Sequence, residues 1–303
     1  MTLLTLARVI VMARPAAASL AIVLALGAGA CSSSEQTAID CPGTTACVAD
    51  AAPCPEPPDA AAPDASDSGA ETRRLRVMTF NTQHAASSSL EALAAVVNAE
   101  APDLVGLEEV DNEAARSGRV NQSYRLGQLT GMASLFRSAF TFPDGGDYGL
   151  ALLSRYPIIT SDKVELTSSG EQRILIVVRV EIEPGTQIPV AVTHLDLDAS
   201  TRETEAAEIG SALAGEPSAI LMGDLNEQPG GPAIATLTAS LADVWPLAGQ
   251  GGGETFPSGA PTERIDFVML GAAWPAPLEA HVPETTASDH RPVVTTVPLP
   301  DEP

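Results

Sequence analysis

Six short polar clusters stand at the ends of apolar segments in this 303-residue chain. Histidines, carboxylates and amides transfer protons and bind hard divalent cations, so the clusters are candidates for catalysis. A single Asp at such a place is usually a turn residue or a helix cap, and a single His usually has a structural role. Six clusters in one chain, with two histidines among them, favour a shared active site. The clusters are Asn81, Glu108-Glu109, His194, Asp224 with Asn226, Asp266, and Asp289-His290.

Short strands and helices must position these clusters, and the hydrophobic pattern predicts both. The turn sequence EPGT at 183–186 predicts a hairpin. Because hairpins and strand–helix alternation occur together, we expect an α/β (α+β) fold. Its core would be a mixed sheet, or two packed sheets with helices outside, rather than a doubly wound parallel sheet. The expected helices are 90–98, 201–214 and 234–241, and the expected strands are 74–80, 104–107, 150–153, 174–182, 188–193, 219–222, 265–270 and 293–297.

Residues 1–31 have the features of a signal peptide. Their apolar run of about 15 residues is short for a membrane span and fits a signal-peptide core. It ends in Ala28-Gly29-Ala30-Cys31, which is similar to a bacterial lipobox, although such boxes usually have Leu where Ala28 stands. We therefore expect lipidation of Cys31 and a lipid-anchored location in the cell envelope. The alternatives are an ordinary cleaved signal and a secreted protein, and a true start at Met12.

Residues 32–72 are rich in Ala, Pro, Asp and Ser and lack apolar periodicity. Such a segment cannot bury enough surface to offset the entropy lost on ordering, so we expect a disordered, extended tether. Of its three cysteines, Cys41, Cys47 and Cys54, at most one pair can close internally once Cys31 is lipidated. Residues 73–303 would form one folded domain, which contains no cysteine and is expected to be a monomer.

The order of the polar motifs resembles the endonuclease/exonuclease/phosphatase superfamily, which includes DNase I, apurinic endonucleases, inositol polyphosphate 5-phosphatases and bacterial sphingomyelinases. The resemblance covers essentially all of 73–303. It implies a DNase I-like four-layer sandwich, in which two packed mixed β-sheets are flanked by helices, and hydrolysis of a phosphoester with Mg²⁺ or Mn²⁺. The matching pieces are TFN (79–81), GLEEVD (106–111), ALLSRYPI (151–158), THLD (193–196), GDLN (223–226), RIDF (264–267) and SDHRPV (288–293).

The resemblance implies that Glu109 is the main metal ligand, with Asn81 supporting it and Asp289 nearby. A phosphodiester repels an attacking hydroxide, and a hard cation held by carboxylate and amide oxygens offsets this charge. Carboxylates without Cys ligands suit Mg²⁺ or Mn²⁺ rather than structural Zn²⁺. Glu108 stands where the family usually has Gln, and strand alternation predicts that it faces solvent, opposite Glu109. Gln83 stands where some nucleases have an acidic residue. Whether the site binds one metal ion or two therefore stays open.

The catalytic roles also come from the resemblance. Asp224 would orient or deprotonate the attacking water, and Asn226 would hydrogen-bond a phosphoryl oxygen. His194 and His290 would contact phosphate oxygens and stabilise the transition state or protonate the leaving oxygen. A carboxylate partner, Asp266, would hold His290 protonated and oriented.

Two arginines are candidates for substrate binding. Arg116 lies in a polar RSG loop similar to one in bacterial relatives, where it would clamp a phosphate bidentately. The alternative for Arg116 is a solvated turn. Arg173, in EQR at 171–173, is a second candidate. A loose alignment suggests Asp147 as the carboxylate partner of His194.

The charge of the chain narrows the choice of substrate. The formal net charge is −23, and residues 73–303 carry 31 acidic and 14 basic residues, of which only Lys163 is a lysine. A protein that binds DNA mainly through phosphates needs clustered Lys and Arg, so extended duplex DNA is not expected as a partner. The two tryptophans, Trp245 and Trp274, each adjoin a proline and form no aromatic hairpin for membrane insertion. We therefore expect a phosphodiesterase acting on a small or lipid-derived phosphoester.

Two other functions stay open. One is a secreted metal-dependent endonuclease or exonuclease, because a local basic patch or a metal can offset global acidity. The other is a surface-binding lipoprotein that has lost catalysis. Such a protein would be expected to lack at least one central side chain. All five are present, which favours an enzyme: Glu109, His194, Asp224, Asn226 and His290.

Overall fold

The computed structural model describes residues 73–300. The predicted signal peptide (1–31) with Cys31 and the predicted tether (32–72) lie outside the described residues and stay predictions. Within the described part, none of the helices has both the length and the apolar character needed to cross a membrane.

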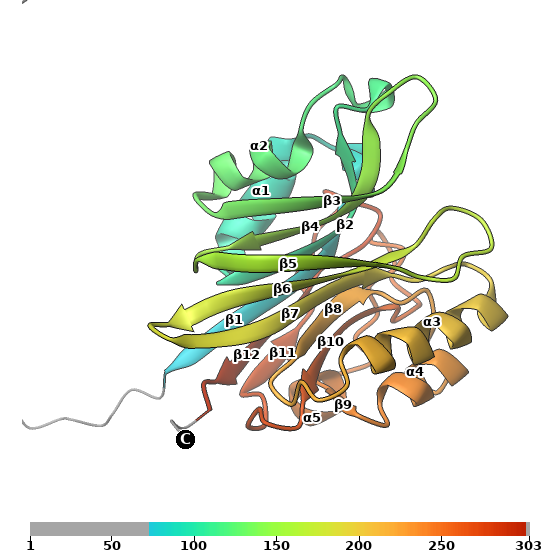
Figure 1. Cartoon of the computed structure of the whole chain (residues 1–303). Coiled ribbons are helices and arrows are strands. Elements are labelled where there is room, and N and C mark those ends of the chain that lie inside the picture. The colour runs from blue at the N-terminus through green and yellow to red at the C-terminus, as the bar shows by residue number, and fades with distance from the viewer. Residues whose placement is uncertain (1–72, 301–303) are drawn as a thin grey trace, which may run out of the picture. The chain divides into compact units, whose positions relative to one another are not determined.

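Twelve strands of the described residues form two six-stranded sheets (Figure 1). The first sheet has the order β11-β12-β1-β2-β4-β3, and the second has the order β5-β6-β7-β8-β10-β9. Each sheet contains one parallel pair, β1 with β2 and β7 with β8, and its other pairs are antiparallel. The first sheet comprises β1 (Arg74–Asn81), β2 (Leu104–Asn112), β3 (Ala133–Thr141), β4 (Asp147–Ser154), β11 (Glu279–His281) and β12 (Val293–Pro298). The second comprises β5 (Ile158–Glu165), β6 (Ile174–Glu183), β7 (Thr186–His194), β8 (Ile220–Asp224), β9 (Leu241–Asp243) and β10 (Asp266–Gly271).

Helices cover the outer face of each sheet, so the fold has four layers (Figure 1). The helices α1 (Leu90–Glu100) and α2 (Gln122–Thr130) pack on the first sheet, and α3 (Ala199–Ala212) and α4 (Pro232–Leu237) pack on the second. A fifth, short helix is α5 (Trp245–Ala248). The mixed-sheet sandwich predicted from the sequence is confirmed.

The central core lies between the two sheets. Val77 and Leu152 from the first sheet and Val192 and Met222 from the second belong to one buried cluster. Burial of such side chains supplies most of the favourable free energy of folding, and it fixes the distance between the sheets. The polar ends of strands from both sheets are therefore held within reach of one another.

The strands that the hydrophobic pattern did not predict are mostly edge or half-buried ones. The strands missed by the pattern are β3, β5, β9 and β11. The helices α2 and α5 were not predicted either. In β5, only three of the eight residues are even partly covered, at every third position, so its sequence lacks an apolar run. The helix expected at 234–241 was wrong at its end, because α4 stops at Leu237 and Leu241 starts β9.

Glu108 lies on the face of β2 that packs toward the second sheet, as Leu104 and Gly106 do, and a β-bulge follows it at Glu109. The pairing of β2 with β4 shifts register between Leu107 and Val110, and Glu109 has a left-handed φ of 54°. A bulge breaks the alternation of side chains that a regular strand would impose. Glu108 is fully buried and accepts a hydrogen bond from Oγ1 of Thr79 at 3.0 Å. The prediction that Glu108 faces solvent was therefore wrong.

Burial determines the protonation of Glu108. Burial and the neighbouring negative charge of Asp266 raise the pKa of Glu108 well above its ordinary value. A neutral carboxylic acid can donate and accept hydrogen bonds, as the amide of Gln does. A neutral Glu108 therefore suits the position where the sequence motif usually has Gln.

We predict that Glu108→Gln stabilises the metal-free protein, and more at pH 8 than at pH 4. Above about pH 4.3 the unfolded chain gains free energy by ionising Glu108, and the folded chain does not until its raised pKa is passed. Stability is therefore lost as pH rises through that window, at about 1.4 kcal/mol per unit of raised pKa. Thermal unfolding in EDTA measures this, with the exposed Glu203→Gln as the control. An equal effect of both variants at the two pH values would contradict the buried neutral acid.

Candidate active site

The sequence-predicted residues meet at one end of the sandwich. The parallel pairs β1–β2 and β7–β8 place Asn81, Glu109, His194 and Asp224 at their carboxyl ends. Asp266 starts β10 directly opposite Asp224, since these strands are antiparallel. A cavity of about 310 Å³ opens there, lined by Glu109, Arg116, Tyr148, Glu171, Arg173, His194, Leu197, Asp224, Asn226, Phe256, Asp289 and His290.

His290 and two aspartates form a buried cluster at the base of this cavity. Nδ1 of His290 lies 2.9 Å from Oδ2 of Asp266, and Nε2 lies 3.7 Å from Oδ2 of Asp224. Burial alone would lower the pKa of His290, but the charge and hydrogen bond of Asp266 raise it to about 10. His290 is therefore a protonated imidazolium at neutral pH, as expected from a pairing with Asp266.

Asp224 has the environment of a strengthened base. Burial and the negative charge of Asp266 raise its pKa above the ordinary Asp value. Its Oδ1 accepts a hydrogen bond from the backbone N–H of Asn226 at 3.0 Å, and its Oδ2 accepts one from the Asn81 amide at 3.0 Å. Two donors thus hold the carboxylate in one orientation.

His194 is neutral and faces Asp224. Burial and the positive charge of Arg173 lower the pKa of His194 to about 3. Both ring nitrogens face donors, Nδ1 the Arg173 guanidinium at 3.4 Å and Nε2 the amide nitrogen of Asn226, so either ring nitrogen can carry the proton. Nε2 lies 3.5 Å from Oδ2 of Asp224 and 3.0 Å from the amide of Asn226.

The suggested pairing of Asp147 with His194 was wrong. Oδ1 of Asp147 accepts hydrogen bonds from the hydroxyls of Ser138 (3.1 Å) and Thr141 (2.5 Å). Asp147 starts β4 and binds the neighbouring strand β3. The position beside Nδ1 of His194 is occupied by Arg173, and His194 needs no carboxylate because it is not charged.

Asn81 links the carboxylates of the two sheets. Its amide nitrogen lies 3.2 Å from Oε1 of Glu109 and 3.0 Å from Asp224. Its oxygen accepts the backbone N–H of Gln83. Burial alone would raise the pKa of Glu109, but the adjacent His84 and Asn81 help lower it to about 2, so Glu109 is ionised. Asn81 therefore supports Glu109 by orienting its carboxylate.

Asp289 lies on the same cavity and is fixed by Gln83. Nε2 of Gln83 donates to Oδ2 of Asp289 at 2.8 Å. Burial raises the pKa of Asp289, and the nearby charge of Glu109 adds to this. Two carboxylates that disfavour each other's charge would gain from a cation between them.

The donor set fits a hard divalent cation. Glu109 is ionised, Asp289 faces the same cavity, and residues 73–303 contain no cysteine. Carboxylate oxygens with imidazole nearby suit Mg²⁺ or Mn²⁺ rather than a thiolate-bound metal. Asp224, Asp266 and His290 also form a compact ligand-type group, but a protonated His290 has no lone pair to give a metal.

Arg116 is a rigid cation on the wall of the cavity. Its Nε and Nη2 donate to both oxygens of the fully buried Asp111, at 2.9 and 2.8 Å. Its guanidinium also stacks over Phe142 and Tyr148, at 4.7 and 5.3 Å from the ring centroids. The two bonds to Asp111 leave the remaining N–H groups of Arg116 available to an anion. The side chain is 39% exposed and lies in the short 3-10 turn Ala115–Ser117, so the solvated turn stays the alternative.

The sequence did not point to His84, which also lies at this site. Its Nδ1 is 3.6 Å from Oε2 of Glu109. The motif NTQHA places it three residues after Asn81, and a His so close to a motif residue was the available signal. Asp111 was missed too, because nothing local shows that a buried acid will orient Arg116.

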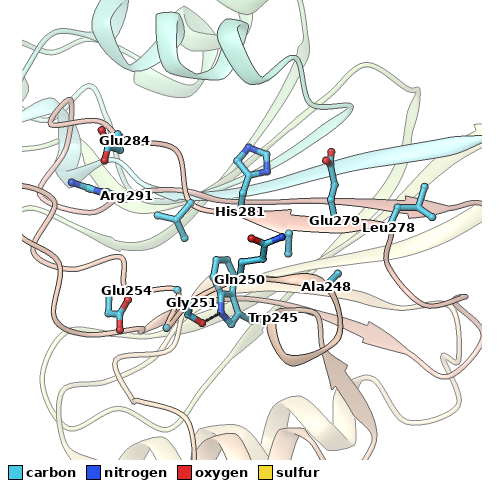
Figure 2. A pocket seen from close by; sticks show the side chains of 14 residues that line it. Trp245, Ala248, Gln250, Gly251, Glu254, Leu278, Glu279, His281, Glu284 and Arg291 are labelled. Atoms are coloured by element: carbon cyan, nitrogen blue, oxygen red, sulfur yellow. Dashed lines mark hydrogen bonds between the residues drawn. The ribbon is translucent and has the colours of Figure 1, made fainter.

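A larger hollow, of about 740 Å³, lies between the loop after α5 and the edge strand β11 (Figure 2). In it, Nε1 of Trp245 donates to the carbonyl of Gly251 at 3.1 Å (Figure 2). His281 already contacts Glu100 at 2.9 Å, and Glu279 contacts Arg76 at 2.9 Å. None of the sequence-predicted site residues lines this hollow, so the smaller cavity is the candidate active site.

Solved structures share this architecture. The structure of an endonuclease/exonuclease/phosphatase from Beutenbergia cavernae is 25% identical and has a TM-score of 0.65, over 75% of this chain and 72% of that chain. A mannosyl-6-phosphatase from Bacteroides thetaiotaomicron is 16% identical with a TM-score of 0.62, over 74% of this chain and 99% of that chain. The catalytic domain of human Nocturnin is 20% identical with a TM-score of 0.58, over 74% of this chain and 94% of that chain. No curated protein matches the chain.

The family model for the Endonuclease/Exonuclease/phosphatase family matches residues 78–290. This range begins three residues before Asn81 and ends at His290, so it spans all of the convergent polar residues. The match covers well over half of the chain, and the two-sheet fold agrees with it. The chain therefore belongs to the endonuclease/exonuclease/phosphatase family of metal-dependent phosphoester hydrolases.

Proposed function

We propose that the chain is a Mg²⁺- or Mn²⁺-dependent phosphodiesterase that acts on a small or lipid-derived phosphoester. One observation carries this proposal: a cavity of about 310 Å³ brings an ionised Glu109, the imidazolium of His290 and two guanidinium groups onto one small space. That volume suits a small ligand rather than a polymer groove.

The side chains divide the chemistry between them. Asp224, with its raised pKa, is a base strong enough to orient and deprotonate an attacking water. His290 carries a positive charge that Asp266 maintains, so it stabilises charge on the phosphoryl oxygens. His194 and Asn226 are neutral and donate hydrogen bonds there without adding charge.

Glu109 and Asp289 would hold the cation, and Asn81 and Gln83 orient these two carboxylates. When bound, the cation offsets the charge of the phosphoester and polarises its P–O bonds. The acidic character of the domain makes this contribution necessary, because the cavity itself contains three carboxylates besides Glu109.

The positions of Arg116 and Arg173 favour a compact anionic substrate in the proposed reaction. Both line the cavity, and each is held by another side chain, Arg116 by Asp111 and Arg173 beside His194. Leu197, which is 76% exposed, and Phe256 provide apolar contacts on the same cavity. An apolar group next to the phosphate, as in a lipid-derived ester, would cover them.

The expected location also stays part of the proposal. Lipidation at Cys31 would place the enzyme in the cell envelope as a monomer, joined to its anchor by residues 32–72, where lipid-derived phosphoesters occur. Without lipidation the same enzyme would be secreted. Mass spectrometry of the mature N-terminus distinguishes these two locations.

We predict that EDTA abolishes hydrolysis by the full chain and that Mg²⁺ or Mn²⁺ restores it. The test compares bis-p-nitrophenyl phosphate, p-nitrophenyl phosphate, mixed phospholipids and plasmid DNA. The diester or a lipid should be cleaved fastest. Faster cleavage of the monoester would favour a phosphatase, and plasmid nicking would favour the nuclease. No metal-dependent release from any substrate would favour the surface-binding lipoprotein.

We predict that Asp224→Asn and His290→Ala each lower kcat by about 100-fold or more, because one removes the base and the other the imidazolium. Thermal unfolding should show that both variants fold. His281→Ala is the control, because that histidine lies on β11 and pairs with Glu100. Near-normal kcat in either active-site variant would refute the assigned roles.

We predict that Arg116→Lys raises KM by about 10-fold while kcat falls less, because Lys keeps the charge but loses the planar fork. Lys also leaves Asp111 with a cationic partner, so the fold should be retained. Arg125→Lys is the matched control, since Arg125 pairs with Glu91 on the protein surface. An unchanged KM in Arg116→Lys would mean that Arg116 only stabilises its loop.

A further inference from the structure

The turn after Asn81 has an unusual backbone. Gln83, His84 and Ala85 are consecutive and all left-handed, with φ of 47°, 42° and 58°. None is glycine, and each such conformation costs on the order of 1 kcal/mol or more. A conformation of this kind persists only when its surroundings enforce it.

Hydrogen bonds from both sides of the site enforce the turn. Oδ1 of Asn81 accepts the Gln83 N–H at 3.0 Å, and the Gln83 side chain donates to Asp289. On the other side, Nε2 of the buried Gln122 donates to the His84 carbonyl at 2.8 Å. Oε1 of Gln122 accepts the backbone N–H of Asp111 at 2.9 Å, which connects the turn to β2.

The result is that the His84 imidazole faces Glu109. Nδ1 of His84 lies 3.6 Å from Oε2 of Glu109, beyond hydrogen-bonding distance. This nitrogen is buried and has no hydrogen-bond partner among the described residues. A buried polar atom without a partner costs about 1–3 kcal/mol, which is a second cost on the same residue.

The 3.6 Å between these two atoms lies within the range for two ligands of one ion, between the adjacent and the opposite arrangement. In an octahedral site with bonds of about 2.1 Å, ligand atoms lie about 3 Å apart when adjacent and about 4 Å apart when opposite. Oε1 of Glu109 is taken by Asn81, and Oε2 is the oxygen nearer His84. Oε2 of Glu109 and Nδ1 of His84 are therefore the atoms of this pair left for a shared cation.

We propose that His84 is a ligand, through Nδ1, of the divalent cation that Glu109 binds, and that its imidazole makes the site select Mn²⁺ over Mg²⁺. Imidazole nitrogen is a good ligand for first-row transition metals, whereas Mg²⁺ prefers carboxylate and water oxygens. The inference rests on the proposed function, because it concerns the cation of that reaction. It gives a physical reason for the strained turn, which places the imidazole.

The test measures metal binding directly, without substrate. Mn²⁺ binding to the metal-free full chain is followed by the EPR signal of free Mn²⁺, and Mg²⁺ binding by calorimetry. We expect His84→Ala and His84→Phe to weaken Mn²⁺ binding by about 10-fold or more, and Mg²⁺ binding much less. Pulsed EPR of bound Mn²⁺ should show coupling to a directly bound nitrogen in the native protein and not in these variants.

Two controls separate the possible failures. His281→Ala, which removes the histidine paired with Glu100, should change neither affinity. Glu109→Gln should weaken the binding of both metals. Nitrogen coupling that is absent from the native protein, or that persists in both His84 variants, would overturn the proposal. If the native chain bound neither metal, the metal dependence of the proposed function would fail as well.

Discussion

Repulsion among carboxylates is the constraint on which this site depends. The central packing of two sheets brings Glu108, Asp224 and Asp266 from three strands into one buried region, and Glu109 and Asp289 lie beside it. Several unscreened negative charges in so small a volume would cost far more than the fold can supply. The charges of these carboxylates are therefore neutralised or compensated in different ways. Glu108 is neutral, Asp266 is paired with an imidazolium, and Glu109 and Asp289 are left for a cation.

This division also explains why two histidines in one cavity differ so much. His290 faces Asp266 and Asp224 and is charged, whereas His194 faces the Arg173 guanidinium and is neutral. The same residue type thus provides a cation in one place and a neutral donor in the other. Asp224 lies between them, within 3.7 Å of both rings. In the proposed reaction, this position would let one carboxylate act on water while both rings contact the phosphoryl group.

Much of the fold and the site was predictable because regular strands leave a pattern in a short stretch of sequence. Central strands bury both faces and read as apolar runs, and the polar residue that ends each run marks the site. Edge strands such as β5 have no such pattern, so they were missed. The exposure predicted for Glu108 was wrong because β2 is covered on both faces, by the second sheet and by helices, and this packing is not visible in the local pattern. His84 and the Asp111–Arg116 pair depend on tertiary hydrogen bonds in the same way.

The net charge of the domain and the charge that a substrate meets are different quantities. Exposed acids spread over the surface are screened beyond about 8–10 Å at physiological salt, so they affect approach more than binding. Inside the cavity, Arg116, Arg173 and His290 are cations fixed by other side chains, within reach of one phosphoester. An acidic surface repels a long polyanion along its whole length, whereas a short ester meets only the local cations. Under the proposed function, the acidic surface would therefore disfavour long polyanions, and the fixed cations would bind the phosphate of a short ester.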